Sequence, residues 1–123
     1  MELPDLKTLV DADRGVISRE IFTSSAIYKR ELESLFTRTW LFVGHESLVP
    51  NPGDFYLSRM GEESVILCRD RTGDIHVFLN SCTHRGMKVC RYDKGNAKVF
   101  TCPYHAWSFA LDGSLQGVPH FDD

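Results

Sequence analysis

The sequence lacks the marks of a membrane, exported or repeat protein. No apolar run approaches the roughly 20 residues that cross a bilayer, and no repeat or low-complexity tract is visible. The stretch Met1–Asp5 has neither the basic start nor the apolar core of a secretion signal. The net charge of −3 disfavours a nucleic-acid surface. We therefore expect a cytoplasmic protein that binds neither membranes nor nucleic acids.

Cysteine is scarce as well, with four residues in a chain of 123. A chain of this length can bury a core without disulfide bonds, and a content of 42% hydrophobic and 25% charged residues is ordinary for a globular domain. Cysteines without an export signal suggest a reducing compartment, where thiolates stay available for metal. Motifs rather than composition must therefore indicate the function.

Two short segments each combine one cysteine with one histidine. The first reads Cys82-x-His84, the second reads Cys102-x2-His105, and seventeen residues separate them. A mixed-ligand [2Fe–2S] centre has two cysteines on one iron and two histidines on the other. A spacing of two or three residues lets one loop reach both irons, so we predict these four residues as the cluster ligands.

Two other metal sites remain open on the residues alone. Two cysteines and two histidines also suit one tetrahedral zinc, although zinc sites usually place like ligands together at each end of the motif. A cluster on all four cysteines would ignore both histidines, and the spacings of Cys68, Cys82, Cys90 and Cys102 do not fit the plant-type C-x4-C-x2-C run. A zinc-binding structural module is therefore the alternative from a different class of protein.

The remaining metal-capable residues point to ordinary roles. Cys68 lies within a predicted strand and reads as a small buried hydrophobe, whereas we expect Cys90 to be half exposed. Single histidines without a partner at ligand spacing suit surface or hydrogen-bonding roles, and these are His45, His76 and His120. No 2-His-1-carboxylate iron site is visible in the chain.

One helix is predicted before a β-rich region. Ser24 and Ser25 suit a helix start, and the helix should run from Ala26 to about Thr39. Apolar residues recur along it at steps of three and four, which predicts one stripe facing the core: Tyr28, Leu32, Leu35, Phe36 and Trp40. The preceding residues form an N-terminal arm.

After Trp40 the composition favours strands. Predicted strands cover residues 40–43, 55–58, 64–68, 75–79, 97–100 and 107–109, with turns at 70–73 and 112–113. The two Cys/His segments then lie at the tips of hairpins. Strands on both sides would hold each tip, which suits a rigid metal mount.

The two loops resemble those of the Rieske iron–sulfur proteins. Arg85-Gly86 after the first histidine and Trp107 two residues after the second resemble the α subunit of aromatic-ring-hydroxylating dioxygenases. The stretch from Tyr28 to Pro119 is similar to naphthalene and biphenyl dioxygenase α subunits, including residues 40–42, 52–54 and 112–115. Ala106 departs from that group, which usually has glycine there. A methyl group is tolerated at this position if the backbone φ is negative.

The resemblance implies a mainly β fold. Small antiparallel sheets would be stacked, the cluster would sit on two hairpin loops, and one helix would precede them. The expected division is an arm over residues 1–25 and a Rieske [2Fe–2S] domain over residues 26–123. The catalytic domain, with its mononuclear Fe(II), would lie in a C-terminal part that this chain lacks, so we expect a piece of a longer protein and no ring hydroxylation by this chain alone.

The same resemblance implies an electron route. Electrons would pass from a ferredoxin or reductase to this cluster, and then to the mononuclear iron in the catalytic domain of the same or a neighbouring α subunit, which cis-dihydroxylates an aromatic ring. A small β subunit is a further expected partner. The alternative within this class is a free-standing Rieske ferredoxin, and the substrate is not indicated.

The loops also resemble those of respiratory Rieske proteins, with two differences. Met87 and Tyr104 stand where that high-potential group has a disulfide, and Trp107 and Phe109 stand where it has a serine and a tyrosine hydroxyl. Hydrogen bonds to cluster sulfur raise the potential. We therefore expect a potential near about −150 mV, at the low end of the Rieske range. Arg85 either brings positive charge to the cluster face or forms an ordinary surface ion pair.

Overall fold

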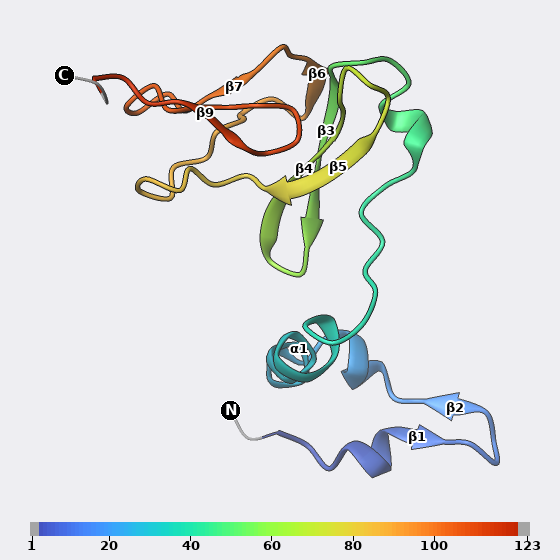
Figure 1. The fold of residues 1–123 in the computed structure, drawn as a ribbon. Helices are drawn as coiled ribbons and strands as arrows, with labels where there is room; N and C mark the ends of the chain where they lie inside the picture. Colours follow the sequence, from blue (N-terminus) through green and yellow to red (C-terminus); the bar gives the residue numbers. More distant parts are fainter. Residues whose placement is uncertain (1–2, 121–123) are drawn as a thin grey trace. The chain divides into compact units, whose positions relative to one another are not determined.

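The computed structural model describes residues 3–120, which fall into two compact units divided after Leu41 (Figure 1). The helix belongs to the first unit, so this division differs from the boundary expected after residue 25. Among the residues that the structure describes, no helix is both long enough and apolar enough to span a bilayer. Each unit is taken by itself below.

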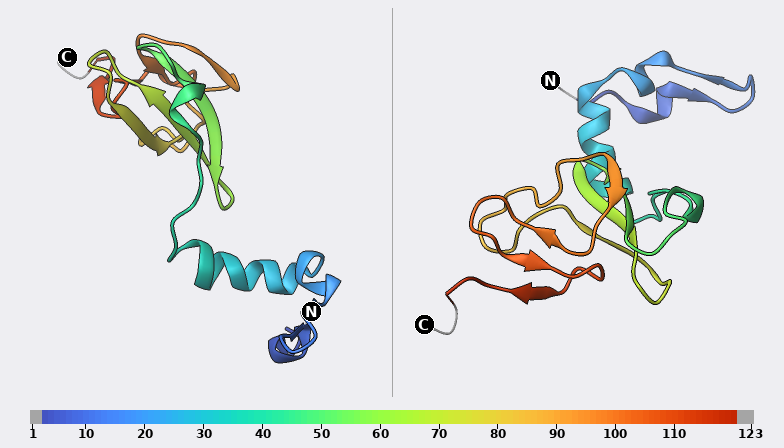
Figure 2. Two further views of the ribbon diagram at one scale, coloured as in Figure 1. Left: turned by 90° about the vertical axis from the view of Figure 1, so that its right-hand side faces the viewer. Right: turned by 90° about the horizontal axis from the view of Figure 1, so that it is seen from above.

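The first unit consists of short helical turns, one hairpin and the predicted helix, whose winding Figure 2 shows most clearly. The Ser24 hydroxyl accepts a hydrogen bond from the Ile27 N–H at 3.4 Å, so the predicted helix start is confirmed. The elements are η1 (Leu6–Leu9), β1 (Val10–Asp11), β2 (Val16–Ile17), η2 (Arg19–Phe22), α1 (Ser25–Glu31) and the π-helical η3 (Leu32–Phe36).

The apolar stripe predicted on this helix is not buried. Ile27 is the buried residue of α1, whereas Tyr28 and Leu35 are exposed. The change to π winding in η3 adds a residue to each turn, so later side chains no longer continue a 3.6-residue stripe. The strand predicted over residues 40–43 is also wrong, because this stretch has no partner strand, and Trp40 and Phe42 are exposed.

The second unit begins with η4 (Glu46–Leu48) and is built on two antiparallel sheets. The larger sheet has the order β5-β4-β3-β6, and the smaller has the order β7-β8-β9. The larger sheet contains β3 (Asp54–Met60), β4 (Glu63–Arg69), β5 (Ile75–Leu79) and β6 (Lys94–Asn96). The smaller sheet contains β7 (Phe100–Thr101), β8 (Ser108–Phe109) and β9 (Leu115–Gly117). The predicted fold class is therefore confirmed: mainly β, with small antiparallel sheets and an α-helix before them.

Strands β6 and β9 were not predicted, because neither has the alternation of apolar residues that marks a strand. β6 exists through its neighbour: it pairs with β3 in the register Asp54 to Asn96 and Tyr56 to Lys94. Gly95 lies against the Phe55 ring, and a Cβ there would be 3.0 Å from the ring edge. A larger side chain would push this ring out of the core.

The core of the second unit includes the two predicted cysteine ligands. Phe100 contacts the rings of Phe55 and Phe78 edge-on, with centroids 5.5 and 5.9 Å apart. Buried residues from both sheets and both loops form one cluster: Phe55, Ile66, Cys68, Cys82, Cys90, Phe100, Cys102, Phe109 and Leu111. The two loops that carry the predicted ligands, residues 82–87 and 102–107, are called the metal loops below. Their cysteines anchor them directly in the hydrophobic core.

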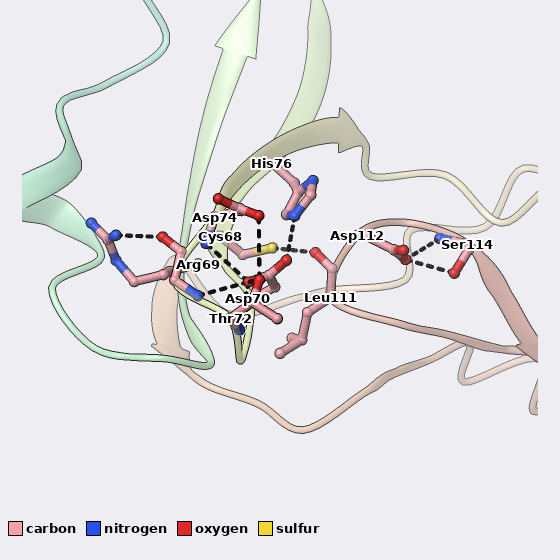
Figure 3. Close-up of polar contacts among 10 residues, drawn as sticks. Cys68, Arg69, Asp70, Thr72, Asp74, His76, Leu111, Asp112 and Ser114 are labelled. Atoms are coloured by element: carbon pink, nitrogen blue, oxygen red, sulfur yellow. Dashed lines mark hydrogen bonds and ion pairs between the residues drawn. The ribbon is translucent and has the colours of Figure 1, made fainter.

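A polar network joins the larger sheet to the β8–β9 turn (Figure 3). The buried Cys68 thiol donates to the Leu111 carbonyl at 2.8 Å, and burial raises the pKa of this thiol to about 11. The predicted buried role of Cys68 is therefore confirmed. His76 lies 2.7 Å from the Asp70 carboxylate and is the main cause of the lowered pKa of Asp70, so its predicted hydrogen-bonding role is confirmed too.

Candidate metal centre

The first metal loop is a tight turn closed by two backbone hydrogen bonds. The Cys82 N–H donates to the Met87 carbonyl at 2.8 Å. The Gly86 N–H donates back to the Cys82 carbonyl, also at 2.8 Å. The Cys82 carbonyl is therefore bonded to the residue four positions later, and the Cys82 N–H to the residue five positions later. His84 lies at the tip of this turn.

The second loop has the same backbone frame. The Cys102 N–H donates to the Trp107 carbonyl at 2.8 Å, and the Ala106 N–H donates to the Cys102 carbonyl at 3.0 Å. The offsets of four and five residues from the cysteine are those of the first loop. Ala106 is therefore the counterpart of Gly86, and Trp107 is the counterpart of Met87.

This equivalence explains the backbone at Ala106. Gly86 has a φ of 75°, and Ala106 has a φ of 60°, so both lie in the left-handed region. A methyl group at position 106 is tolerated without strain only at a negative φ, and Ala106 does not meet this condition. A non-glycine residue in this conformation costs about 1 kcal/mol. Counting four residues from each cysteine is a sequence signal that would have revealed the match.

The two predicted cysteine ligands meet inside the protein. Cys82 is 3% exposed and Cys102 is 2% exposed. Burial acts to raise the pKa of Cys102, but the net pKa is lowered by hydrogen bonds from the backbone around Tyr104 and His105, by the Cys82 thiol and by the positive charge of Arg91. These groups favour a thiolate, which is the form that binds iron.

The two predicted histidine ligands meet at the surface. The His84 and His105 rings have centroids 4.7 Å apart and an interplanar angle of 69°. Both side chains are exposed, in contrast to the cysteine pair. The fold thus brings together all four predicted residues, with sulfur on the inner side and imidazole on the outer side.

Aromatic contacts connect the two loops at the histidine side. Trp107, from the second loop, stacks on His84 of the first, with centroids 4.7 Å apart and planes 10° apart. The Arg85 guanidinium of the first loop lies over the Tyr104 ring of the second, 5.7 Å from its centroid. The rings of Tyr104 and His105 in turn have centroids 3.8 Å apart. Each loop therefore holds a side chain of the other.

The Trp107 stack was not predicted, because it joins residues of different loops and leaves no trace in local spacing. Trp107 also packs against the buried core beneath it. All four cysteines are free in the structure. The contacts of Tyr104 and Trp107 therefore connect loops that carry no disulfide.

Asn80 is a second residue whose role sequence reasoning missed. Its buried side chain donates to the Cys90 carbonyl and accepts from the Cys90 N–H, both at 2.8 Å. This clamp fastens the segment after the first loop to the strand end before it. Cys90 is consequently only 6% exposed, so the expectation that it would be half exposed is wrong.

The donor set fits a two-iron cluster. Within residues 3–120, no three His, Cys, Asp or Glu side chains gather closely enough to hold one metal ion. A mixed-ligand [2Fe–2S] centre needs only two protein ligands on each iron. A buried cysteine pair and an adjacent histidine pair supply that number and that chemistry.

Comparison with known proteins identifies the class. Residues 39–123 match the family model of the Rieske [2Fe–2S] domain. This match covers more than half of the sequence, so the chain belongs to the Rieske [2Fe–2S] domain family. The resemblance seen in the two loops is confirmed.

Relatives of the chain include the α subunit of a dioxygenase and the large oxygenase component of a hydroxylase. The chain is 49% identical over 115 residues to the biphenyl 2,3-dioxygenase subunit alpha of Rhodococcus jostii (strain RHA1), covering 94% of this chain and 25% of that subunit. It is 54% identical over 99 residues to the large oxygenase component of salicylate 5-hydroxylase of a Ralstonia species, covering 80% of this chain and 23% of that component. The chain thus spans about a quarter of the length of these relatives.

A solved structure shows the same fold. Naphthalene 1,2-dioxygenase from a Rhodococcus species, bound to indole, superimposes with a TM-score of 0.80 at 43% sequence identity. The match covers 84% of this chain and 23% of the dioxygenase chain. The predicted likeness to the N-terminal Rieske part of dioxygenase α subunits is therefore confirmed.

Proposed function

We propose that this chain is the electron-transfer domain of an aromatic-ring-hydroxylating oxygenase, with Cys82 and Cys102 on one iron and His84 and His105 on the other. The observation that carries this proposal is the pairing of the side chains: two buried thiols meet on one side and two exposed imidazoles on the other. When bound, the cluster supplies one-electron redox chemistry.

The residues around the site support that role in three ways. The core cluster around the two cysteines keeps water from the sulfur side. The paired backbone hydrogen bonds hold both loops in one shape, so little rearrangement should accompany a change of charge. The imidazoles lie at the surface, where a ring nitrogen can hold a proton and contact a partner.

The wider reaction follows from the relatives. Their names refer to biphenyl, salicylate and naphthalene, so an aromatic ring is the proposed substrate class of the whole enzyme. A ferredoxin or reductase would deliver electrons to this domain. A mononuclear iron in the catalytic domain of the same or a neighbouring α subunit would receive them, and a small β subunit would complete the assembly. This chain alone should then not hydroxylate a ring.

Metal analysis of the purified chain tests the ligand set. We expect about two irons and two acid-labile sulfides per chain and the EPR signal of a reduced Rieske centre. His84→Ala should lose all three signals, because one iron is left with a single protein ligand. His45→Ala is the matched control and should keep them, since the hydrogen bonds of the His45 ring within residues 3–120 stay in its own turn, with Ser47. Stoichiometric zinc in protein purified with iron available would contradict the proposal.

The potential gives a second test. Trp107 and Phe109 offer no hydroxyl group to cluster sulfur, so protein-film voltammetry should find a midpoint near about −150 mV. A midpoint well above zero would show that other donors replace the missing hydroxyls.

A further inference from the structure

Charge is distributed unevenly along this chain. Residues 80–105, which contain all four predicted ligands, hold five basic side chains and one acidic side chain, a net charge of +4. The whole chain has a net charge of −3, so the other 97 residues carry −7. The five cations are Arg85, Lys88, Arg91, Lys94 and Lys98, and the acid is Asp93.

These cations are available to a partner. All five are exposed. Within residues 3–120, the ion pairs of the structure join other residues, and none involves these five. A charged run is commonly a solvated face whose charges are neutralised by neighbours. Here the neutralising neighbours are missing among the residues that the structure describes.

Three of the cations lie around the second metal loop. Arg85 lies over the Tyr104 ring. Arg91 and Lys94 line a surface hollow of about 460 Å³, and Pro103 of the second loop lines it as well. The positive charge is therefore concentrated beside the metal centre.

The hollow itself has an apolar lining. Val99 and Pro103 contribute to its wall, and Tyr92, which is 76% exposed, stands beside them. Apolar surface next to charged side chains is common in protein–protein contacts. Exposed aromatic side chains are frequent anchors in such contacts.

We propose that Arg91, Lys94 and the hollow that they line form a docking surface for an acidic electron-donor protein. This inference rests on the proposed function and names the surface at which the donor would bind. The reduced donor loses one electron and the oxidised centre gains it, and no bond is formed or broken.

Charge complementarity favours this occupant. Positive charge beside the centre and negative charge elsewhere would turn an approaching acidic protein toward the metal loops. Such steering raises the association rate more than the affinity, which suits a donor that must leave after each electron. An apolar hollow also gives a protein partner something to contact besides charge.

Two charge-reversed proteins test the docking surface. The first carries Arg91→Glu and Lys94→Glu, and the matched control carries Arg59→Glu and Lys29→Glu. Both have the same net charge. All four side chains are exposed, and none of them forms an ion pair or a side-chain hydrogen bond among residues 3–120. The probe is a reduced plant-type [2Fe–2S] ferredoxin with an acidic surface, whose potential lies below the Rieske range.

Stopped-flow absorbance measures reduction of the centre under second-order conditions. At about 10 mM salt the Debye length is about 30 Å, and the first protein should react roughly ten-fold more slowly than the wild type. The control should change less than about two-fold, and at about 1 M salt the difference between the two proteins should vanish, because the Debye length falls to about 3 Å. Equal slowing in both proteins would overturn the proposal.

A small-molecule arm separates charge at the centre from docking in the hollow. Reoxidation by ferricyanide, an anion, should slow in the first protein, but by less than the ferredoxin reaction, since ferricyanide has no apolar surface to place in the hollow. Equal slowing with both reagents would overturn the role of the hollow.

Iron, sulfide and EPR analysis of all three proteins distinguishes a failure of the docking proposal from a failure of the proposed function. Absence of a cluster from the wild type would contradict the proposed function. A normal cluster with an unchanged ferredoxin rate in the first protein would contradict the docking surface alone.

Discussion

The two metal loops have one backbone frame and different side chains. In each loop the cysteine carbonyl accepts a hydrogen bond from the N–H four residues later, and the cysteine N–H donates to the carbonyl five residues later. The first loop places glycine and Met87 at those positions, whereas the second places Ala106 and Trp107. The histidine also differs, two residues after Cys82 and three after Cys102. The frame therefore depends on the backbone bonds, and the side chains decide strain and cross-loop contact.

Removing a cysteine should have the largest effect, and the same effect in both loops. Cys82→Ala and Cys102→Ala should each abolish the cluster absorbance, because a single thiolate remains for its iron. The matched control is Cys68→Ala, which also removes a buried cysteine. It should lower the free energy of unfolding by about 1–3 kcal/mol yet keep the cluster. A cluster retained in either loop variant would show that the loops are not equivalent in ligation.

The residues five positions after each cysteine should contribute unequally to the free energy of unfolding. Trp107→Ala removes the stack on His84 and a contact with the core, so we expect a loss of about 2–4 kcal/mol in urea unfolding and faster release of iron to a chelator. Met87→Ala should cost less than about 1 kcal/mol, since Met87 is exposed. Trp107→Phe should restore part of the loss. Equal costs at the two positions would mean that the stack contributes nothing.

Residues four positions after each cysteine should respond in opposite directions. Ala106→Gly should stabilise the protein by about 0.5–1 kcal/mol, because glycine adopts a positive φ without strain. Gly86→Ala should destabilise it by about 1 kcal/mol for the same reason. The urea midpoints of the two variants measure this. A destabilised Ala106→Gly protein would mean that the alanine methyl group makes a contact worth more than the strain.

A substitution outside both loops should change the stability of the protein and leave its cluster content unchanged. His76 lowers the pKa of Asp70, so the pair stabilises the folded protein above the unfolded pKa of about 3.9. This contribution is lost as the pH falls through the lower pKa of the folded state. The stability gap between wild type and His76→Ala should therefore be widest above about pH 4 and close in acid, with cluster content unchanged. A gap that does not vary in urea titrations from pH 3 to 7 would exclude this linkage.

Some features of the fold were predictable because they are local. The turn after β4 follows from Asp70, whose carboxylate accepts from the N–H groups of Thr72 and Gly73. The helix start follows from the Ser24 cap. The central strands follow from runs of β-branched and aromatic residues, and the side chains of β5 alternate between exposed and half-buried. Each of these signals lies within a few residues of the structure it causes.

Other features depend on contacts between distant residues. The stretch over residues 40–43 has strand composition but no neighbouring strand to bond, and it is irregular. β6 has no strand composition and forms because β3 offers it an edge. Exposure of the helical stripe likewise depends on what packs against it, which helix periodicity does not indicate.

The features of the metal centre also divide into those that the sequence predicts and those that depend on tertiary contacts. The sequence by itself predicted the ligand set, because two loops that each carry one Cys and one His can supply two cysteines to one iron and two histidines to the other, and the pairs Cys82/His84 and Cys102/His105 fit that pattern. Only the tertiary structure decided that the thiols lie inside and the imidazoles outside, that Trp107 stacks on His84, that Asn80 buries Cys90, and that Ala106 takes a positive φ. The reason is physical: ligand spacing is a property of a few consecutive residues, whereas burial, stacking and strain arise when segments far apart in the chain are packed against each other.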